Sequence, residues 1–116
     1  MRTFIFDRKE WRIPKFDSIG AFATLIAHGE HSGGVRVTCL TVEAGGVIGT
    51  HPAVGGQVFL VVSGSGWVSG PEGERCPIQA GQGVRWDKGE IHTSGTDAGF
   101  TAIAIEGPTL EIFEEK

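Results

Sequence analysis

Short apolar runs, interrupted by glycine and proline, are the main pattern along this chain. Runs of this length bounded by turn residues are typical of β-strands. The expected strands cover residues 3–6, 22–27, 35–43, 47–51, 57–62, 67–69, 74–79, 84–86, 91–94, 100–105 and 110–113. A weak helical pattern at residues 10–17 is interrupted by Pro14. About ten short antiparallel strands separated by turns predict an all-β barrel or sandwich.

The segment 57–62 also indicates how the strands pack. Its odd-numbered residues share one face and its even-numbered residues share the other, and both faces are apolar after Gln57. A strand that is apolar on both sides fits a barrel whose outer face packs against a second subunit. After the glycine-rich segment 63–66, residues 67–69 are expected to pair back as a hairpin.

Length and composition narrow the class of protein. A chain of 116 residues with 40% hydrophobic residues fits one globular domain. Its formal charge of −4 and the lack of a basic stripe argue against a nucleic-acid partner. No apolar stretch is long enough for a signal peptide or a membrane span, so we expect a cytoplasmic protein with no membrane partner. Cys39 and Cys76 are then expected to be reduced.

Residues 45–64 carry a glycine and histidine spacing that is specific. The run from Gly45 to Gln57 reads G-G-V-I-G-T-H-P-A-V-G-G-Q. With its continuation to Gly64, it resembles the first motif of the cupin family, G-x5-H-x-H-x3-4-E-x6-G, and Gly45, His51 and Gly64 match. Ala53 stands where the second histidine belongs, and Gln57 stands where the glutamate belongs.

Residues 81–96 resemble the second cupin motif, G-x5-P-x-G-x2-H-x3-N. Gly81, Gly89 and His92 match, while Asp87 replaces the proline and Thr96 replaces the asparagine. With the flanking strands, the resemblance extends over nearly the whole chain. It implies a single cupin domain over residues 1–116, a double-stranded β-helix (jelly-roll barrel) of two facing antiparallel sheets, and a homodimer, as is common for small members of the family.

The resemblance also implies a metal site. In the family these motif positions converge inside the barrel, which assigns the ligand set His51, Gln57 and His92. His51 and Gln57 are expected on adjoining strands, and His92 on the opposing sheet. The implied cofactor is a divalent transition metal, and zinc, nickel, iron and manganese all remain open. Because Ala53 donates nothing and Gln57 offers only a neutral amide oxygen, this site would be weaker than the family's three-histidine, one-glutamate set.

Two functions remain open, since the cupin fold carries many activities. The first is a metal-dependent enzyme acting on a small organic molecule as an isomerase, dioxygenase or decarboxylase, with no catalytic residue assigned. The second is a non-catalytic small-molecule-binding cupin with a degenerate metal site. In that case His51 and His92 would hydrogen-bond a ligand, each other, Gln57 or an ordered water.

Other residues are expected to shape the pocket. Phe59 and Val61 share a face with Gln57, so they are predicted to point into the barrel. The family pattern implies that Val84 and Trp86 also point inward.

The remaining histidines and one neighbouring strand complete the candidates. His28 and His31 lie beside glycines, and we expect both on the surface. Cys39 or Thr41 would face the pocket if the odd-numbered residues of 35–43 point inward, and the sequence leaves that register open.

Overall fold

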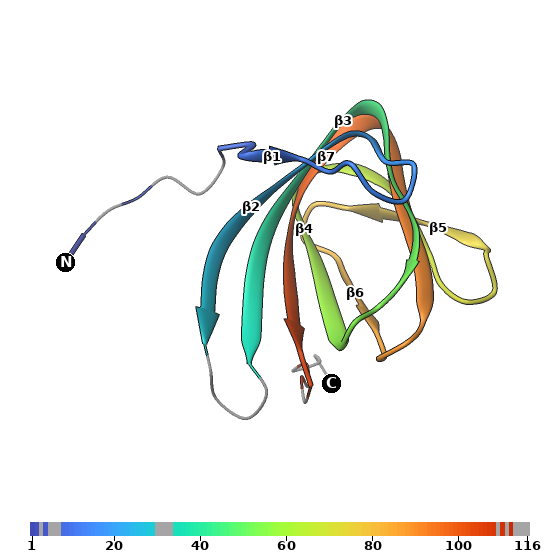
Figure 1. The fold of residues 1–116 in the computed structure, drawn as a ribbon. Coiled ribbons are helices and arrows are strands. Elements are labelled where there is room, and N and C mark those ends of the chain that lie inside the picture. Colours follow the sequence, from blue (N-terminus) through green and yellow to red (C-terminus); the bar gives the residue numbers. More distant parts are fainter. Residues whose placement is uncertain (3, 5–7, 30–33, 109, 111, 113–116) are drawn as a thin grey trace.

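The chain folds into one antiparallel sheet whose long strands curve around a core to form an open barrel (Figure 1). The computed structural model describes all residues except 3, 5–7, 30–33, 109, 111 and 113–116. The strands are β1 (Trp11–Arg12), β2 (Ile19–Gly29), β3 (Val35–Pro52), β4 (Gly56–Ser69), β5 (Arg75–Gln79), β6 (Gly83–Trp86) and β7 (Ile91–Gly107). The all-β prediction is therefore confirmed, and the described residues contain no helix.

Three of the strands each join two strands that the sequence predicts as separate. The expected strands 35–43 and 47–51 are both part of β3, while 91–94 and 100–105 are both part of β7. Similarly, β4 includes 57–62 and 67–69 and runs straight through the glycine-rich segment 63–66. The predicted hairpin at that segment is wrong, because residues 65–69 pair with β5 and β7 rather than with the first half of β4.

Glycines explain why a strand continues where a turn was expected. The register of β4 against β7 shifts between Val61 and Ser63 and again between Ser65 and Trp67, so the strand is irregular there without reversing. Gly64 has a φ of 82°, and a Cβ placed on it would overlap the carbonyl oxygen of Gly99 on β7. Glycine at this position therefore permits a bend with close strand contact.

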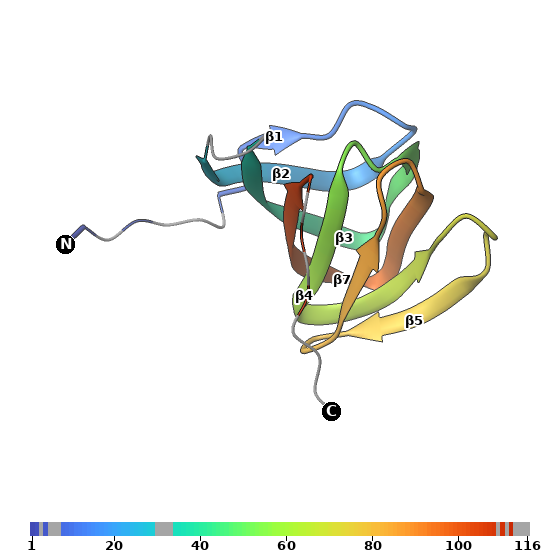
Figure 2. The same ribbon diagram turned by 90° about the horizontal axis from the view of Figure 1, so that it is seen from below.

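The long strands bend, and each contributes to two facing walls (Figure 2). The strand order is β1-β2-β3-β7-β4-β5, with β6 paired to β4. Wall A comprises β2, β6 and residues 35–42 of β3, 56–61 of β4 and 100–107 of β7. Wall B comprises β5 and residues 47–52 of β3, 65–69 of β4 and 91–95 of β7. This arrangement agrees with the two facing sheets implied by the motif resemblance.

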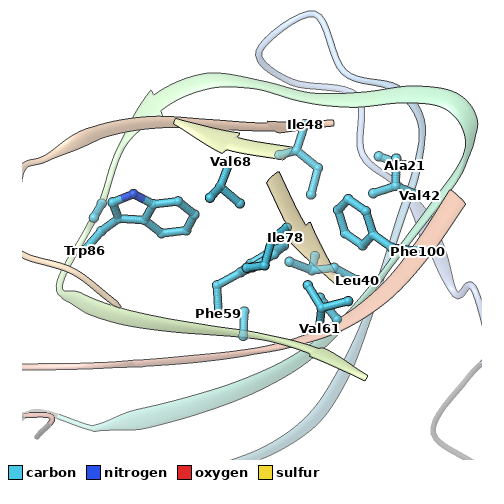
Figure 3. Packing of buried hydrophobic residues seen from close by; sticks show 13 residues of the cluster. Ala21, Leu40, Val42, Ile48, Phe59, Val61, Val68, Ile78, Trp86 and Phe100 are labelled. Atoms are coloured by element: carbon cyan, nitrogen blue, oxygen red, sulfur yellow. The ribbon is translucent and has the colours of Figure 1, made fainter. Parts of the chain in front are cut away.

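The core fills the space between the walls (Figure 3). Its cluster includes Leu40, Ile48, Phe59, Val61, Val68, Ile78, Trp86 and Phe100. The Phe59 ring lies 5.6 Å from the Trp86 ring and 5.7 Å from the Phe100 ring, centroid to centroid. Aromatic contacts at such distances add to the stabilisation that burial provides. In the described part of the chain, no helix is long and apolar enough to span a membrane.

Some sequence predictions fall outside the described residues. Three of the four residues of the strand expected at 3–6 and two of the four at 110–113 are undescribed, and so is His31. The weak helical pattern at residues 10–17 corresponds to β1 and a following turn, where Phe16 and Asp17 have φ angles of 62° and 55°. His28 lies in β2, one residue before its end.

Candidate functional site

A cavity of about 120 Å³ lies between the two walls, and the three predicted ligands His51, Gln57 and His92 line it. The apolar and aromatic residues that line it are Ile13, Phe16, Leu40, Ile48, Phe59, Trp86 and Ala104. Its polar groups are Thr38, His51, Gln57, His92, Ser94 and Glu106. The cavity is smaller than the roughly 300–1,000 Å³ that is usual for drug-sized ligands. It has room for a few non-hydrogen atoms or for ordered water.

The two histidines are direct neighbours across a pair of strands. His51 on β3 and His92 on β7 are Cα partners in the ladder of wall B, and their ring centroids are 4.4 Å apart. The expectation that His92 lies on the sheet opposite His51 is therefore wrong. The bends in β3 and β7 bring the end of one strand beside the start of the other, and this pairing places both imidazoles on one wall.

Backbone carbonyls orient both imidazole rings. Nδ1 of His51 lies 2.7 Å from the carbonyl oxygen of Gly49, and Nδ1 of His92 lies 3.1 Å from the carbonyl oxygen of Glu90. A carbonyl only accepts hydrogen bonds, so each neutral ring must donate its Nδ1 proton. Each Nε2 then carries a lone pair, which can accept a hydrogen bond or ligate a metal.

His92 is the more deeply buried of the two rings, with 3% of its surface exposed. Its ring stacks on Trp86 with centroids 4.2 Å apart and planes 20° from parallel. Burial disfavours the imidazolium and lowers the pKa of His92 from its ordinary value of 6.5, an effect that the nearby His51 reinforces and the Glu90 carbonyl opposes. The folded structure thus favours the neutral imidazole of His92.

The Nε2 atom of His92 is the one unsatisfied polar side-chain atom found buried among the described residues. Most buried polar atoms in proteins have a hydrogen-bond partner, and leaving one unpaired costs about 1–3 kcal/mol. The ring carrying this acceptor lines the cavity. A hydrogen-bond donor from outside the chain would remove that cost.

Wall A supplies a row of neighbouring side chains opposite the histidines. Gln57 on β4 is the Cα partner of both Trp86 on β6 and Glu106 on β7, and Glu106 is in turn the partner of Arg36 on β3. The expectation that Gln57 adjoins the His51 strand is therefore wrong, because β7 lies between β3 and β4 in the sheet. Glu106 brings a carboxylate to the cavity that the motifs did not indicate.

The segment between β1 and β2 covers the side of the cavity next to His51. The Phe16 ring stacks on the His51 ring, with centroids 4.3 Å apart and planes 13° from parallel. A Cβ on Gly49 would overlap the carbonyl oxygen of Phe16, and the Gly49 N–H donates to Ser18 Oγ at 3.1 Å. Gly49 is therefore required for this segment to approach β3 so closely.

The structure separates the predicted pocket residues into two groups. Phe59 and Trp86 line the cavity together with His51, Gln57 and His92. Val61 is buried in the core at 2% exposure and Val84 packs against the core half-buried, and neither is among the cavity-lining residues.

Several lining residues could not be assigned from the sequence. Thr38 and Leu40 line the cavity, so the even-numbered residues of this part of β3 point inward and Cys39 and Thr41 do not line it. Hydrophobic alternation could not distinguish these registers, because residues on both faces are apolar or small. Phe16, Ser94 and Glu106 carry no local signal, since only the pairing of distant strands brings them to the site.

Ala53, at the position of the missing histidine, has a structural role instead. It is 3% exposed and belongs to the core cluster. Its N–H donates to the Glu90 carbonyl at 3.0 Å, and its own carbonyl accepts from Gly89 N–H at 2.8 Å. These two bonds join the β3–β4 loop to the β6–β7 turn.

The donor set does not fit a resident transition metal by itself. His51 and His92 supply two nitrogens and Gln57 a neutral oxygen, so the set has no negative charge to balance a cation. Among the described residues, no group of three or more His, Cys, Asp or Glu side chains is placed to hold a metal ion. Glu106 shares the cavity but is not part of such a group.

This geometry defines a double-stranded β-helix with an internal polar cavity, and comparisons with solved structures identify the fold as that of the cupins. A cupin-like protein from Thermotoga maritima superposes with a TM-score of 0.77 and 21% identity, covering 90% of this chain and 80% of that one. A conserved double-stranded β-helix protein from Klebsiella pneumoniae gives a TM-score of 0.70 at 19% identity, covering 93% and 90%. The cupin fold predicted from the motifs is thus confirmed.

Enzymes also occur among the structural neighbours. Salicylate 1,2-dioxygenase from Pseudoaminobacter salicylatoxidans gives a TM-score of 0.67 at 21% identity, and the match covers 75% of this chain but 26% of that one. The same enzyme has been solved in complex with gentisate. No protein-family model and no curated protein sequence matches this chain. At such identities the similarity establishes the fold alone.

Proposed function

We propose that this chain is a small-molecule-binding cupin in which His51 and His92 accept hydrogen bonds from a ligand. The observation that carries the proposal is the buried Nε2 of His92, which has no partner in the described part of the chain. Its lone pair is available because Nδ1 is committed to the Glu90 carbonyl. The cavity around it suits a compact molecule that carries O–H or N–H donors and has few non-hydrogen atoms.

Side-chain ¹⁵N NMR of the histidines tests this proposal. Ethanediol and acetone serve as probes, because each has four non-hydrogen atoms and only ethanediol has donors. Ethanediol should shift the Nε2 resonance of His92 in a saturable manner and acetone should not. His92→Phe, which keeps a ring for stacking on Trp86, should abolish saturable binding. Equal shifts from both probes, or no shift from ethanediol, would contradict the proposal.

A metal-dependent enzyme is the second candidate function. It is favoured by the anchoring of both Nδ1 atoms to backbone carbonyls, since metal-bound histidines commonly hold their other nitrogen in this way. His51, His92 and Gln57 would be the ligands, and a metal there would act as a Lewis acid on a substrate oxygen. A further ligand would have to come from solvent or substrate.

Elemental analysis distinguishes the two candidates. The protein would be purified without added metal and also after incubation with zinc, nickel, iron or manganese, alongside His51→Ala and His92→Ala. Binding by hydrogen bonds predicts no stoichiometric metal in any sample. About one equivalent in the wild type, lost in both variants, would replace the binding proposal with the metal-dependent enzyme.

We also propose that the chain forms a homodimer through the outer face of wall A. Leu60 in wall A and Val62 just beyond it on β4 are 37% and 50% exposed, and Leu60 pairs with Ile103 on β7. A second copy would bury these apolar side chains. Light scattering should give twice the monomer mass for the wild type and the monomer mass for Leu60→Lys/Val62→Lys, whereas a monomeric wild type would refute the dimer.

The cytoplasmic location stays a prediction, which cell fractionation tests.

A further inference from the structure

A second and larger hollow lies at the barrel end where β2 finishes and β3 begins, and its volume is about 750 Å³. It shares one lining residue, Glu106, with the inner cavity. Apolar side chains from three segments form most of its wall, among them Leu25, Val35 and Val54. We call this hollow the mouth groove. Its volume lies in the range that is usual for sites binding drug-sized molecules.

Hydrogen bonds hold the two loops of the mouth groove together. Val54 follows Ala53, whose N–H and carbonyl bond to Glu90 and Gly89, and Lys88 precedes Gly89. The apolar Val54 side chain and the Lys88 ammonium group are therefore carried by segments that are fixed to each other. Arg36, on the opposite side, is positioned by the β3–β7 ladder, where it is the partner of Glu106.

The charges of the mouth groove are not neutralised within it. Arg36 and Lys88 carry two positive charges and Glu106 one negative charge, which leaves a net charge of about +1 at neutral pH. None of the three forms an ion pair with any described residue. Leu25 and Val54 are 46% and 82% exposed, so apolar surface lies open beside the cations.

We propose that the mouth groove binds an organic carboxylate with an apolar body. The carboxylate would lie near Arg36 and Lys88, and the apolar body would cover Leu25, Val35 and Val54. A small inorganic anion would leave that apolar surface exposed to water, and an organic cation would be repelled by the two positive side chains. This site is separate from the hydrogen-bonding site at His51 and His92.

Binding of hexanoate, followed by backbone ¹H–¹⁵N NMR, tests the proposal. Hexanamide and hexylammonium have nearly the same apolar body with neutral and positive ends, and acetate has the carboxylate without the body. Hexanoate should bind tighter than the other three, with shifts at residues 25–27, 34–36, 54–55 and 88, and more weakly as salt is added. Equal binding of hexanoate and hexanamide, or shifts confined to the inner cavity, would overturn the proposal.

Charge variants of the mouth groove give a sharper test. Arg36→Gln and Lys88→Gln should each weaken hexanoate binding about three- to fivefold, as is typical of exposed ionic contacts, and the double variant about tenfold. Glu106→Gln should strengthen it about twofold or more by removing a like charge. Lys9→Gln, a charge change outside both cavities, is the control. Unchanged affinity in the folded double variant, checked by its melting temperature, would refute the site.

The proposals for the two sites can be refuted separately. His92→Phe removes the buried acceptor and should leave hexanoate binding at the mouth groove unchanged. A wild type that binds hexanoate but gives no response to ethanediol would uphold the mouth groove and refute the inner site. Loss of hexanoate binding in His92→Phe, with the fold intact, would show that the two are one site and would overturn the present inference.

Discussion

The inner cavity and the mouth groove share Glu106 but differ in almost every other respect. The inner cavity has a volume of about 120 Å³, and stacked aromatic and imidazole rings form much of its wall. The mouth groove has a volume of about 750 Å³, with charged side chains beside exposed apolar ones. Burial favours the neutral form of His92 in the first, whereas Arg36 and Lys88 of the second are exposed. The inner site can therefore select by hydrogen-bond direction and size, and the outer one by charge and apolar area.

Removing the Trp86 ring, on which His92 stacks, should cause the largest loss of stability. Trp86 is 3% exposed, and it contacts both His92 and Phe59. Trp86→Ala should lower the free energy of unfolding by about 3–5 kcal/mol because it empties part of the core. Chemical denaturation measures this loss. Trp11→Ala, which removes a side chain that is 52% exposed, is the matched control and should cost far less, and a similar loss in both variants would contradict the assignment of Trp86 to the core.

Adding a single methyl group at Gly49 should have the next largest effect. Gly49→Ala places a Cβ on the carbonyl of Phe16, so either the β1–β2 segment moves away or strain builds up in β3. We expect a loss of about 1–3 kcal/mol in the free energy of unfolding, with NMR shifts at Phe16 and Ser18. Gly70→Ala is the matched control, since the nearest atom to its Cβ would be 3.8 Å away. Equal stability of the two variants would show that this close approach is not needed.

The protonation of His92 should make stability depend on pH. Its pKa is lowered in the folded state, so between that value and 6.5 the unfolded chain binds more protons than the folded one. The free energy of unfolding should therefore decrease as the pH falls through 6.5, and this contribution should level off below the folded pKa. The titratable residues that contribute to this shift are His51 and Glu90, and Glu106 also lines the cavity.

His92→Phe isolates this contribution. Denaturation of the variant and the wild type from pH 8 to pH 5 should show a shallower decrease in the variant. Identical slopes would mean that His92 keeps its ordinary pKa in the folded protein. No histidine is among the described residues that line the mouth groove, so hexanoate binding should change little between pH 8 and pH 6, above the range in which carboxylates take up protons.

Opening the inner cavity at its cover should have the smallest effect on stability. Phe16 is 45% exposed, so Phe16→Ala should lower the free energy of unfolding by about 1 kcal/mol or less. It should nevertheless speed the exchange of a probe such as ethanediol, because the ring that stacks on His51 is gone. NMR line shapes measure this exchange. Unchanged exchange in the variant would show that ligands enter by another route.

The sequence allowed the fold and the central histidines to be predicted because their spacing is local. The glycine and histidine positions of the two motifs lie within short segments, and strand pairing turns that spacing into proximity. The sequence predicts a turn at residues 63–66, where β4 in fact continues, because glycine serves both tight turns and close strand contacts, and only the position of Gly99 on β7 distinguishes the two. Arg36 and Glu106 could not be found, since they become neighbours only through the register of β3 against β7.

The bends in β3 and β7 link unfolding of the site to unfolding of the whole barrel. Each strand contributes to both walls: β3 carries Thr38 and His51, and β7 carries His92 and Glu106. A slip in their pairing would displace the two sides of the cavity at once. The backbone amides around the site should therefore exchange with solvent as one cooperative unit, at rates close to those for unfolding of the whole barrel. Loss of the β3–β7 pairing should appear as loss of the entire barrel, with no half-formed pocket in between.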